Sequence, residues 1–180
     1  MLARYKRLLD GIGTVERGLG IALILFIVAA ITVQVFSRYL LGRPIAWVEE
    51  SATYAFIWMV FVGAGVGMKE GRHILVATFG SRLPPRFGAA LLMLVWLLVM
   101  TTLAVLIVLG LKVIEVEGRS KSISLPIELP RSWFYSLPLT FSAVSMMLTA
   151  IYLFLQELPA LAGRAAPPEG AAAGTQGIPL

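Results

Sequence analysis

The sequence predicts an all-α integral membrane protein with four transmembrane helices and an N-terminal amphipathic helix at the membrane interface. Of the 180 residues, 58% are hydrophobic and 14% are charged, and the mean hydropathy is +0.86. About a quarter of the residues of a soluble domain are charged. Four long apolar stretches lack any charged side chain, and each is long enough to cross the ~30 Å hydrocarbon core. The expected spans are 18–37, 51–68, 87–111 and 132–156.

Residues 1–17 carry apolar side chains near helical spacing, with basic side chains and Asp10 between them. This pattern favours an amphipathic helix in the headgroup plane. A loose basic tail is the alternative, because Gly11 and Gly13 weaken the helix. The following span, 18–37, is expected to be retained and not cleaved as a signal peptide, because it is long and no small-residue cleavage site follows it.

The later spans carry their own packing and turn signals. Gly63 and Gly67 form a small-xxx-small pair, which predicts close approach of another helix in the lipid. Pro84-Pro85 is expected to end the basic loop 69–86 and to start the third span. In the fourth span, which follows the polar loop 112–131, Pro138 predicts a kink.

The fourth span also carries a polar stripe, and the C-terminal segment has a different composition. Ser142, Ser145 and Thr149 recur at helical spacing, which predicts a stripe that faces protein and not lipid. Residues 157–180, rich in Ala, Gly and Pro, are expected to form a disordered cytoplasmic tail.

The segment 38–50 is too polar to lie in hydrocarbon, so we expect it to be the exposed link of a membrane hairpin. Its acids, Glu49 and Glu50, have two interpretations. Either they stabilise the N-terminus of the second helix through its dipole, or one of them forms an ion pair within or between subunits. Arg38 and Arg43 are the nearby candidates for such a pair.

Three aromatic side chains and one histidine complete the candidate set. Tyr39 and Trp47 are expected to be interfacial belt residues. Trp58 lies deep in its span, so its indole N–H needs an acceptor, unless the residue sits nearer an interface. His73, in a basic turn, is expected to be a solvated or capping residue.

Composition excludes several kinds of chemistry. With no Cys and one His, the chain cannot form disulfides, thiolate metal sites or two-histidine haem ligation by itself. Nucleophile, metal-ligand and phosphate-binding motifs are absent, so we expect no enzyme activity, cofactor or metal. The net charge is only +5, and the basic residues flank apolar runs. This pattern favours membrane lipids over nucleic acid as the partner.

The expected spans contain no Asp, Glu, Lys, Arg or His, whereas ion-coupled carriers keep such groups at membrane depth. A self-sufficient secondary transporter is therefore disfavoured, and a helical accessory protein is favoured. The positive-inside rule compares nine Lys and Arg on the side of the termini with six on the other side, out of 15. It predicts that both termini are cytoplasmic.

The order of several motifs resembles the small membrane subunit (DctQ-like) of tripartite ATP-independent periplasmic (TRAP) transporters. The motifs, spread over residues 20–155, are Arg38-Tyr39, Trp47-x-Glu49-Glu50, Tyr54, Trp58, Gly63-Ala64 and Glu70-Gly71-Arg72-His73-Ile74, with weaker matches at Leu125-Pro126 and Tyr135-x-x-Pro138. Where the family often has an Arg three residues after the acid pair, this chain has Thr53, so no salt bridge is carried over to that position.

The resemblance implies a complex of a periplasmic substrate-binding protein, this subunit and a large TRAP membrane subunit in the bacterial inner membrane. In the family the large subunit carries the substrate and sodium sites, and the small subunit is regarded as its scaffold. Sodium-coupled uptake of an organic acid follows from the same resemblance. The alternative class is a stand-alone four-helix membrane anchor or assembly subunit of an electron-transfer complex.

Overall fold

The computed structural model describes residues 2–70, 85–122 and 129–161. Its elements are the helices α1 (Leu2–Leu40), α2 (Ala46–Lys69), α4 (Pro85–Glu117) and α5 (Ser136–Leu161), and the short 3₁₀ turn η1 (Arg131–Trp133). All four long helices have the length and hydropathy needed to cross a membrane. The predicted all-α membrane fold with four transmembrane helices is therefore confirmed.

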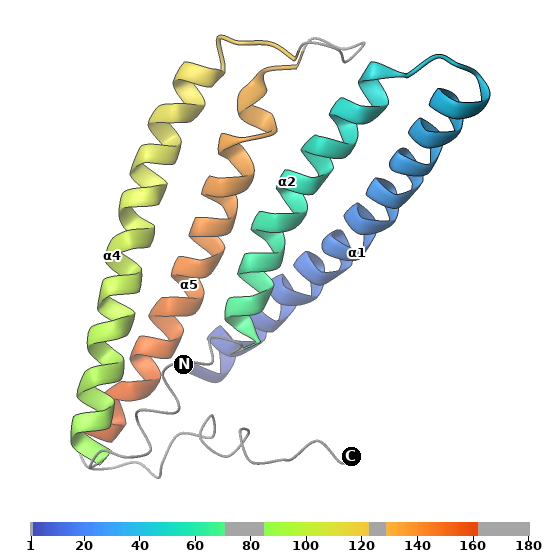
Figure 1. Cartoon of the computed structure of the whole chain (residues 1–180). Coiled ribbons are helices and arrows are strands. Elements are labelled where there is room, and N and C mark those ends of the chain that lie inside the picture. Colours follow the sequence, from blue (N-terminus) through green and yellow to red (C-terminus); the bar gives the residue numbers. More distant parts are fainter. Residues whose placement is uncertain (1, 71–84, 123–128, 162–180) are drawn as a thin grey trace, which may run out of the picture.

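The four helices stand in one row, in the spatial order α1, α2, α5, α4 (Figure 1). Both outer pairs, α1 with α2 and α5 with α4, are antiparallel, and the central pair α2 and α5 runs in the same direction. α1 leans across the row, so that its N-terminal turns also reach α5. The start of α1 and the end of α5 consequently lie at the same end of the molecule, here called the inner end; the opposite end is called the outer end.

Burial differs sharply between the central and the outer helices. In the most apolar windows, 28% of the residues of α2 and 39% of those of α5 are buried, against 6% in both α1 and α4. A helix that is apolar on all sides but uncovered by its own chain is suited to a lipid environment. The protein core is accordingly small and lies between α4 and α5, around Leu103, Ala143 and Ala150, with Met68 of α2 beside it.

The first helix is longer than the sequence indicated. α1 runs without a break from Leu2 through Gly11 and Gly13 to Leu40, so residues 1–17 form no separate element, and the described part of this segment is helix and not loose tail. Leu9 is buried, and the Tyr5 hydroxyl donates a hydrogen bond to the Leu148 carbonyl over 2.9 Å. These first turns pack on α5. Their depth in the headgroup region stays a prediction.

Two predictions about α4 and α5 were wrong. The predicted loop 112–131 is helical as far as Glu117, because a helix does not need to end where the hydrocarbon ends. The predicted kink at Pro138 also fails, because α5 begins only at Ser136. Pro138 therefore lies in the first turn, where its missing N–H has no intrahelical acceptor to lose.

The links at the outer end are hydrogen-bonded in their described residues. Residues 41–45 join α1 to α2, and Gly42 has φ of 62° there, a left-handed conformation that glycine adopts without steric cost. Between α4 and η1, Lys121 and Pro130 form an antiparallel bridge. As predicted, α4 begins at the second residue of Pro84-Pro85. The predicted disordered tail starts inside α5, which ends at Leu161, and the rest of it lies outside the described residues.

Candidate functional site

A cluster of charged and polar side chains joins three helices at the inner end. Glu16 of α1 and Lys69 of α2 form an ion pair with 2.7 Å between the Lys69 Nζ and the Glu16 Oε2. The Lys69 ammonium also donates to Ser145 Oγ of α5 over 2.5 Å. The Ser145 hydroxyl in turn donates to Glu16 Oε1 over 2.5 Å. We call these three residues the inner clamp.

The inner clamp is shielded from solvent and closely packed. Only 3% of the Glu16 side chain and 9% of the Lys69 side chain are exposed. A Cβ built at Gly65 would lie 3.4 Å from both Glu16 carboxylate oxygens, and one built at Gly13 would lie 3.3 Å from Lys69 Cδ. Each glycine thus leaves the space that a charged side chain of the opposite helix fills. Buried charges are stable only when they are paired and hydrogen-bonded, and all three polar groups here meet that condition.

A second ion pair lies beside the inner clamp and faces outward. Arg17 Nη2 and Glu70 Oε1 are 2.6 Å apart, but 62% of the Arg17 side chain is exposed. Exposed pairs contribute about 0–1 kcal/mol. Adjacent residues of α1 and α2 therefore provide one buried and one exposed link between the same two helices.

The inner clamp was not predicted from the sequence. Glu16 and Lys69 were placed just outside the expected spans 18–37 and 51–68, because the spans were bounded by their nearest charges. One signal was available: in an antiparallel hairpin, the start of the first helix and the end of the second meet at the same end. An acid before the first apolar run and a Lys after the second run are thus brought together.

At the outer end, Glu49 lies between the ends of α1 and α2. Its Oε2 accepts a hydrogen bond from Gln34 Nε2 over 3.3 Å and lies 3.9 Å from Arg38 Nη2. Gln34 also accepts from the Ile45 amide over 3.2 Å. The Glu49 and Arg38 side chains are 65% and 57% exposed, so their attraction is weak. Of the two predicted candidates, Arg38 is the one placed near the acid.

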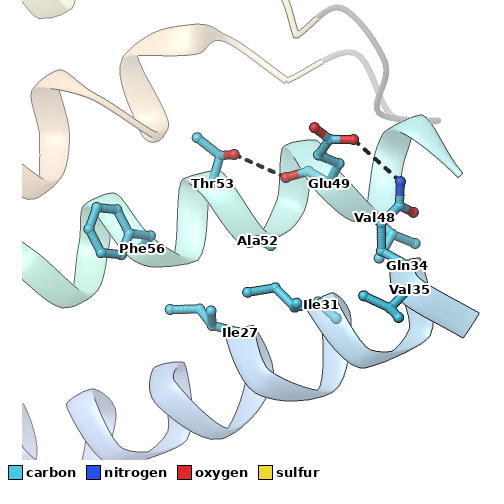
Figure 2. Close-up of a pocket in the computed structure, with 10 residues that line it drawn as sticks. Ile27, Ile31, Gln34, Val35, Val48, Glu49, Ala52, Thr53 and Phe56 are labelled. Atoms are coloured by element: carbon cyan, nitrogen blue, oxygen red, sulfur yellow. Dashed lines mark hydrogen bonds between the residues drawn. The ribbon is translucent and has the colours of Figure 1, made fainter. Parts of the chain in front are cut away.

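Below Glu49, the α1–α2 interface contains an apolar crevice of about 300 Å³. Figure 2 shows Ile27 and Ile31 of α1 facing Ala52 and Phe56 of α2, with the hydrogen bond between Gln34 and Glu49 at one end. The crevice is thus a space between hydrophobic side chains that is closed at the outer end by two polar ones.

Glu50 belongs to a separate aromatic cluster. The Tyr54 hydroxyl donates a short hydrogen bond to Glu50 Oε1, and the buried Tyr54 ring stacks on Phe134 with 3.8 Å between centroids. Tyr135 packs edge-on against Tyr54 at 5.8 Å, and the Arg131 guanidinium lies over the Tyr135 ring. This cluster, here called the outer stack, joins α2 to η1 and the start of α5. Glu49 lies in the first turn of α2, where an acid interacts favourably with the helix dipole.

Of the other aromatic candidates, one is hydrogen-bonded to a neighbouring element and two are exposed. Trp58 Nε1 donates to the Trp133 carbonyl over 3.1 Å, so the deep indole has the acceptor that its position required. Tyr39 and Trp47 are 80% and 49% exposed at the outer end, where belt aromatics are expected. His73 lies outside the described residues.

The predicted glycine pair and the polar stripe have opposite surroundings. Nothing lies within 4 Å of a Cβ built at Gly63 or Gly67, so any helix that approaches them closely is not one of the described helices. Ser142, Ser145 and Thr149 are buried, which confirms that the stripe faces protein. Ser142 Oγ donates to the Phe61 carbonyl over 2.5 Å and so joins α5 to α2.

The arrangement favours structural connection over chemistry. Within residues 2–70, 85–122 and 129–161, no group of three or more His, Cys, Asp or Glu could hold a metal ion. The charged groups of the inner clamp neutralise one another, and the outer stack is an aromatic packing cluster. Together they join α2 to the α5 side of the row at both the inner and the outer end, and the inner clamp also joins α2 to α1.

Comparison with known proteins identifies the class as a membrane subunit of a transporter. Residues 27–160 match the family described as "Tripartite ATP-independent periplasmic transporters, DctQ component". The chain belongs to this family and is a TRAP transporter small permease subunit, not an enzyme. Membership also decides between the two classes that the sequence left open, in favour of the transporter subunit.

Three relatives also carry names of TRAP transporter small permease proteins. The sialic acid TRAP transporter small permease protein SiaQ of Vibrio cholerae is 30% identical over 134 residues, which is 74% of this chain and 76% of the relative. A putative TRAP transporter small permease protein of Haemophilus influenzae is 35% identical over 77 residues, or 43% and 47% of the two chains. The C4-dicarboxylate TRAP transporter small permease protein DctQ of Vibrio cholerae is 38% identical over 68 residues, or 36% and 29%.

Proposed function

We propose that this subunit is a fixed scaffold, and that a large membrane subunit held against it carries the substrate and sodium sites. The observation that carries the proposal is the inner clamp. Within the described residues, the Glu16 and Lys69 side chains form a buried ion pair. Their charges neutralise each other, and both groups are hydrogen-bonded to Ser145. A carrier needs ionisable groups available to its solute or ion, whereas these are committed to joining helices.

A scaffold also requires a surface for its partner, and α2 offers one. Gly63 and Ala64 are exposed, and open space surrounds Gly63 and Gly67. Small residues at this spacing allow the backbone of another helix to approach closely in lipid. We call Gly63, Ala64 and Gly67 the ridge, and we assign it to contact with the large subunit. Because α2 is joined to its neighbours at both its outer and its inner end, the ridge keeps a constant position while the partner moves.

The substrate class is argued from the relatives. Their names specify sialic acid and C4-dicarboxylates, and both kinds of compound carry carboxylates. We therefore propose uptake of an organic acid, delivered by a periplasmic substrate-binding protein and driven by sodium, across the bacterial inner membrane. The excess of Lys and Arg in the sequence segments expected on the side of the termini supports cytoplasmic termini.

Co-purification tests the scaffold function. A tagged copy co-expressed with its large subunit should retain that subunit in mild detergent and restore uptake in cells. Gly63→Leu should lower the yield of the large subunit, because its side chain fills the space left for the partner. The thermal unfolding of the isolated chain should stay unchanged.

Leu23→Ala is the matched control, because it alters a half-buried apolar side chain of α1 away from the ridge; it should retain the large subunit. If this chain alone, in vesicles, accumulated an organic acid when a sodium gradient was applied, the scaffold function would be refuted. Unchanged capture of the large subunit by Gly63→Leu would remove the ridge from the proposal.

A further inference from the structure

An apolar groove separates the first turns of α1 from the middle of α5. Its volume is about 520 Å³, within the roughly 300–1,000 Å³ of small-molecule sites. The α1 side of the groove includes Leu8 and Val15, whose side chains are 66% and 71% exposed. Phe141 and Val144 form the α5 side and are about half-exposed. The chain itself therefore leaves a large apolar surface uncovered in a concave site.

The groove changes character along its length. Phe141 lies one turn of α5 nearer the outer end than Ser145, and thus on the apolar side of the inner clamp. Arg7 also lines the groove, more than two turns of α1 beyond Glu16 in the opposite direction. Arg4 is exposed one turn further out on the same helix face, since residues three apart are neighbours on a helix. Glu16 and Ser145 line the groove between these ends, but Lys69 neutralises the Glu16 carboxylate and both residues are hydrogen-bonded within the inner clamp. One end of the groove is therefore basic, and the other end is hydrocarbon-like.

We propose that this groove binds an anionic phospholipid from the leaflet that surrounds the inner end. One acyl chain lies along Val15, Val144 and Phe141, and the phosphate pairs with Arg7 and Arg4. Charge complementarity and the direction of the polarity gradient carry the assignment, because a phospholipid presents an anion and an apolar chain in this order. The site is separate from the ridge, because none of the residues that line the groove belongs to α2.

Lipid titration by native mass spectrometry tests the proposal on the full chain in detergent. The probes are phosphatidylglycerol and phosphatidylcholine with identical acyl chains. Wild-type protein should bind phosphatidylglycerol more tightly. Arg7→Gln should weaken phosphatidylglycerol binding about fivefold, since one basic residue near a membrane surface contributes on this scale. Phosphatidylcholine binding should fall less, because the cationic choline of this lipid already neutralises its phosphate.

Gly11→Leu tests the groove itself. Gly11 lines the groove, and nothing lies within 4 Å of a Cβ built there, so the new side chain fills the groove without disturbing the fold. Binding of both lipids should fall. Gly18→Leu is the matched control: it lies on the same helix, has equally open surroundings and does not line the groove, so it should bind like wild type.

Two results would overturn the proposal. One is equal lipid binding by the wild-type, Gly11→Leu and Gly18→Leu proteins. The other appears in the complex: if the large subunit displaces phosphatidylglycerol, and Gly11→Leu lowers capture of that subunit, the groove holds a helix of the partner and not a lipid. Capture unaffected by Gly11→Leu, together with lost lipid binding, supports the lipid site.

Discussion

At the scale of single residues, Glu16 has the largest consequence. Its carboxylate is buried where three helices meet, so the buried negative charge is stabilised by Lys69 and Ser145. Breaking a buried pair by removing one partner leaves an uncompensated charge, whereas removing both partners together is often tolerated. This asymmetry separates a structural clamp from a surface ion pair.

We expect Glu16→Leu to lower the free energy of unfolding by about 3–5 kcal/mol, because it leaves the Lys69 ammonium buried without its counterion. Thermal and denaturant unfolding in detergent measures the change. The double variant Glu16→Leu with Lys69→Leu should recover most of the loss. Arg17→Ala, which breaks the exposed neighbouring pair, should cost less than about 1 kcal/mol. Equal losses for Glu16→Leu and Arg17→Ala would contradict a buried clamp.

Trp58 provides a smaller test at the same scale. Trp58→Phe keeps an aromatic ring but removes the indole N–H that donates to the Trp133 carbonyl. Loss of such a hydrogen bond costs about 0.5–1.5 kcal/mol. Trp47→Phe, at an exposed position, is the control and should unfold like wild type. The same unfolding midpoint for both variants would mean that the hydrogen bond contributes nothing.

At the scale of helices, close contact between α4 and α5 depends on Gly110. A Cβ at this position would collide with Thr140 Oγ1, and Thr140 itself is buried and donates to the Ser136 carbonyl over 2.8 Å. Glycine here is thus a requirement of the helix pair, whereas glycines of α1 such as Gly20 have open surroundings.

Gly110→Ala should destabilise the α4–α5 pair by about 1–3 kcal/mol, the usual cost of overpacking. The measurement is the free energy of unfolding in detergent. Adding Thr140→Ala should relieve the collision, so the double variant should be more stable than the sum of the two single changes predicts. Gly20→Ala serves as control and should not destabilise the protein. Additive losses in the double variant would argue against the contact.

The sequence predicted each helix where it follows a run of uncharged, apolar residues, but not where the helix continues beyond that run. The uncharged runs located all four spans, but they gave wrong ends wherever a helix continues past the apolar region, as α4 does to Glu117. The polar stripe was also predictable, because Ser145 and Thr149 follow helical spacing. Glu16 was not identified, since its partner is 53 residues away and the pairing depends on how the helices lean. Pro138 was misjudged because a helix start depends on local caps and not on hydropathy.

At the scale of the whole molecule, the row of helices has an orientation that can be measured directly. The chain has no Cys, so every introduced Cys is a unique label. In intact cells, an impermeant maleimide should label Leu41→Cys and Ser120→Cys, which are exposed at the outer end. Asp10→Cys should react only after permeabilisation, because the positive-inside rule predicts a cytoplasmic inner end. The unsubstituted chain is the control, and the reverse labelling pattern would invert the topology.

The unbroken course of α1 has a practical consequence. With 39 residues at about 1.5 Å each, it is a rod of about 58 Å, roughly twice the hydrocarbon thickness. A fluorescent protein joined helically ahead of Leu2 would be carried as a rigid pointer and not on a tether. Its emission polarisation would then report the tilt of the subunit during a transport cycle.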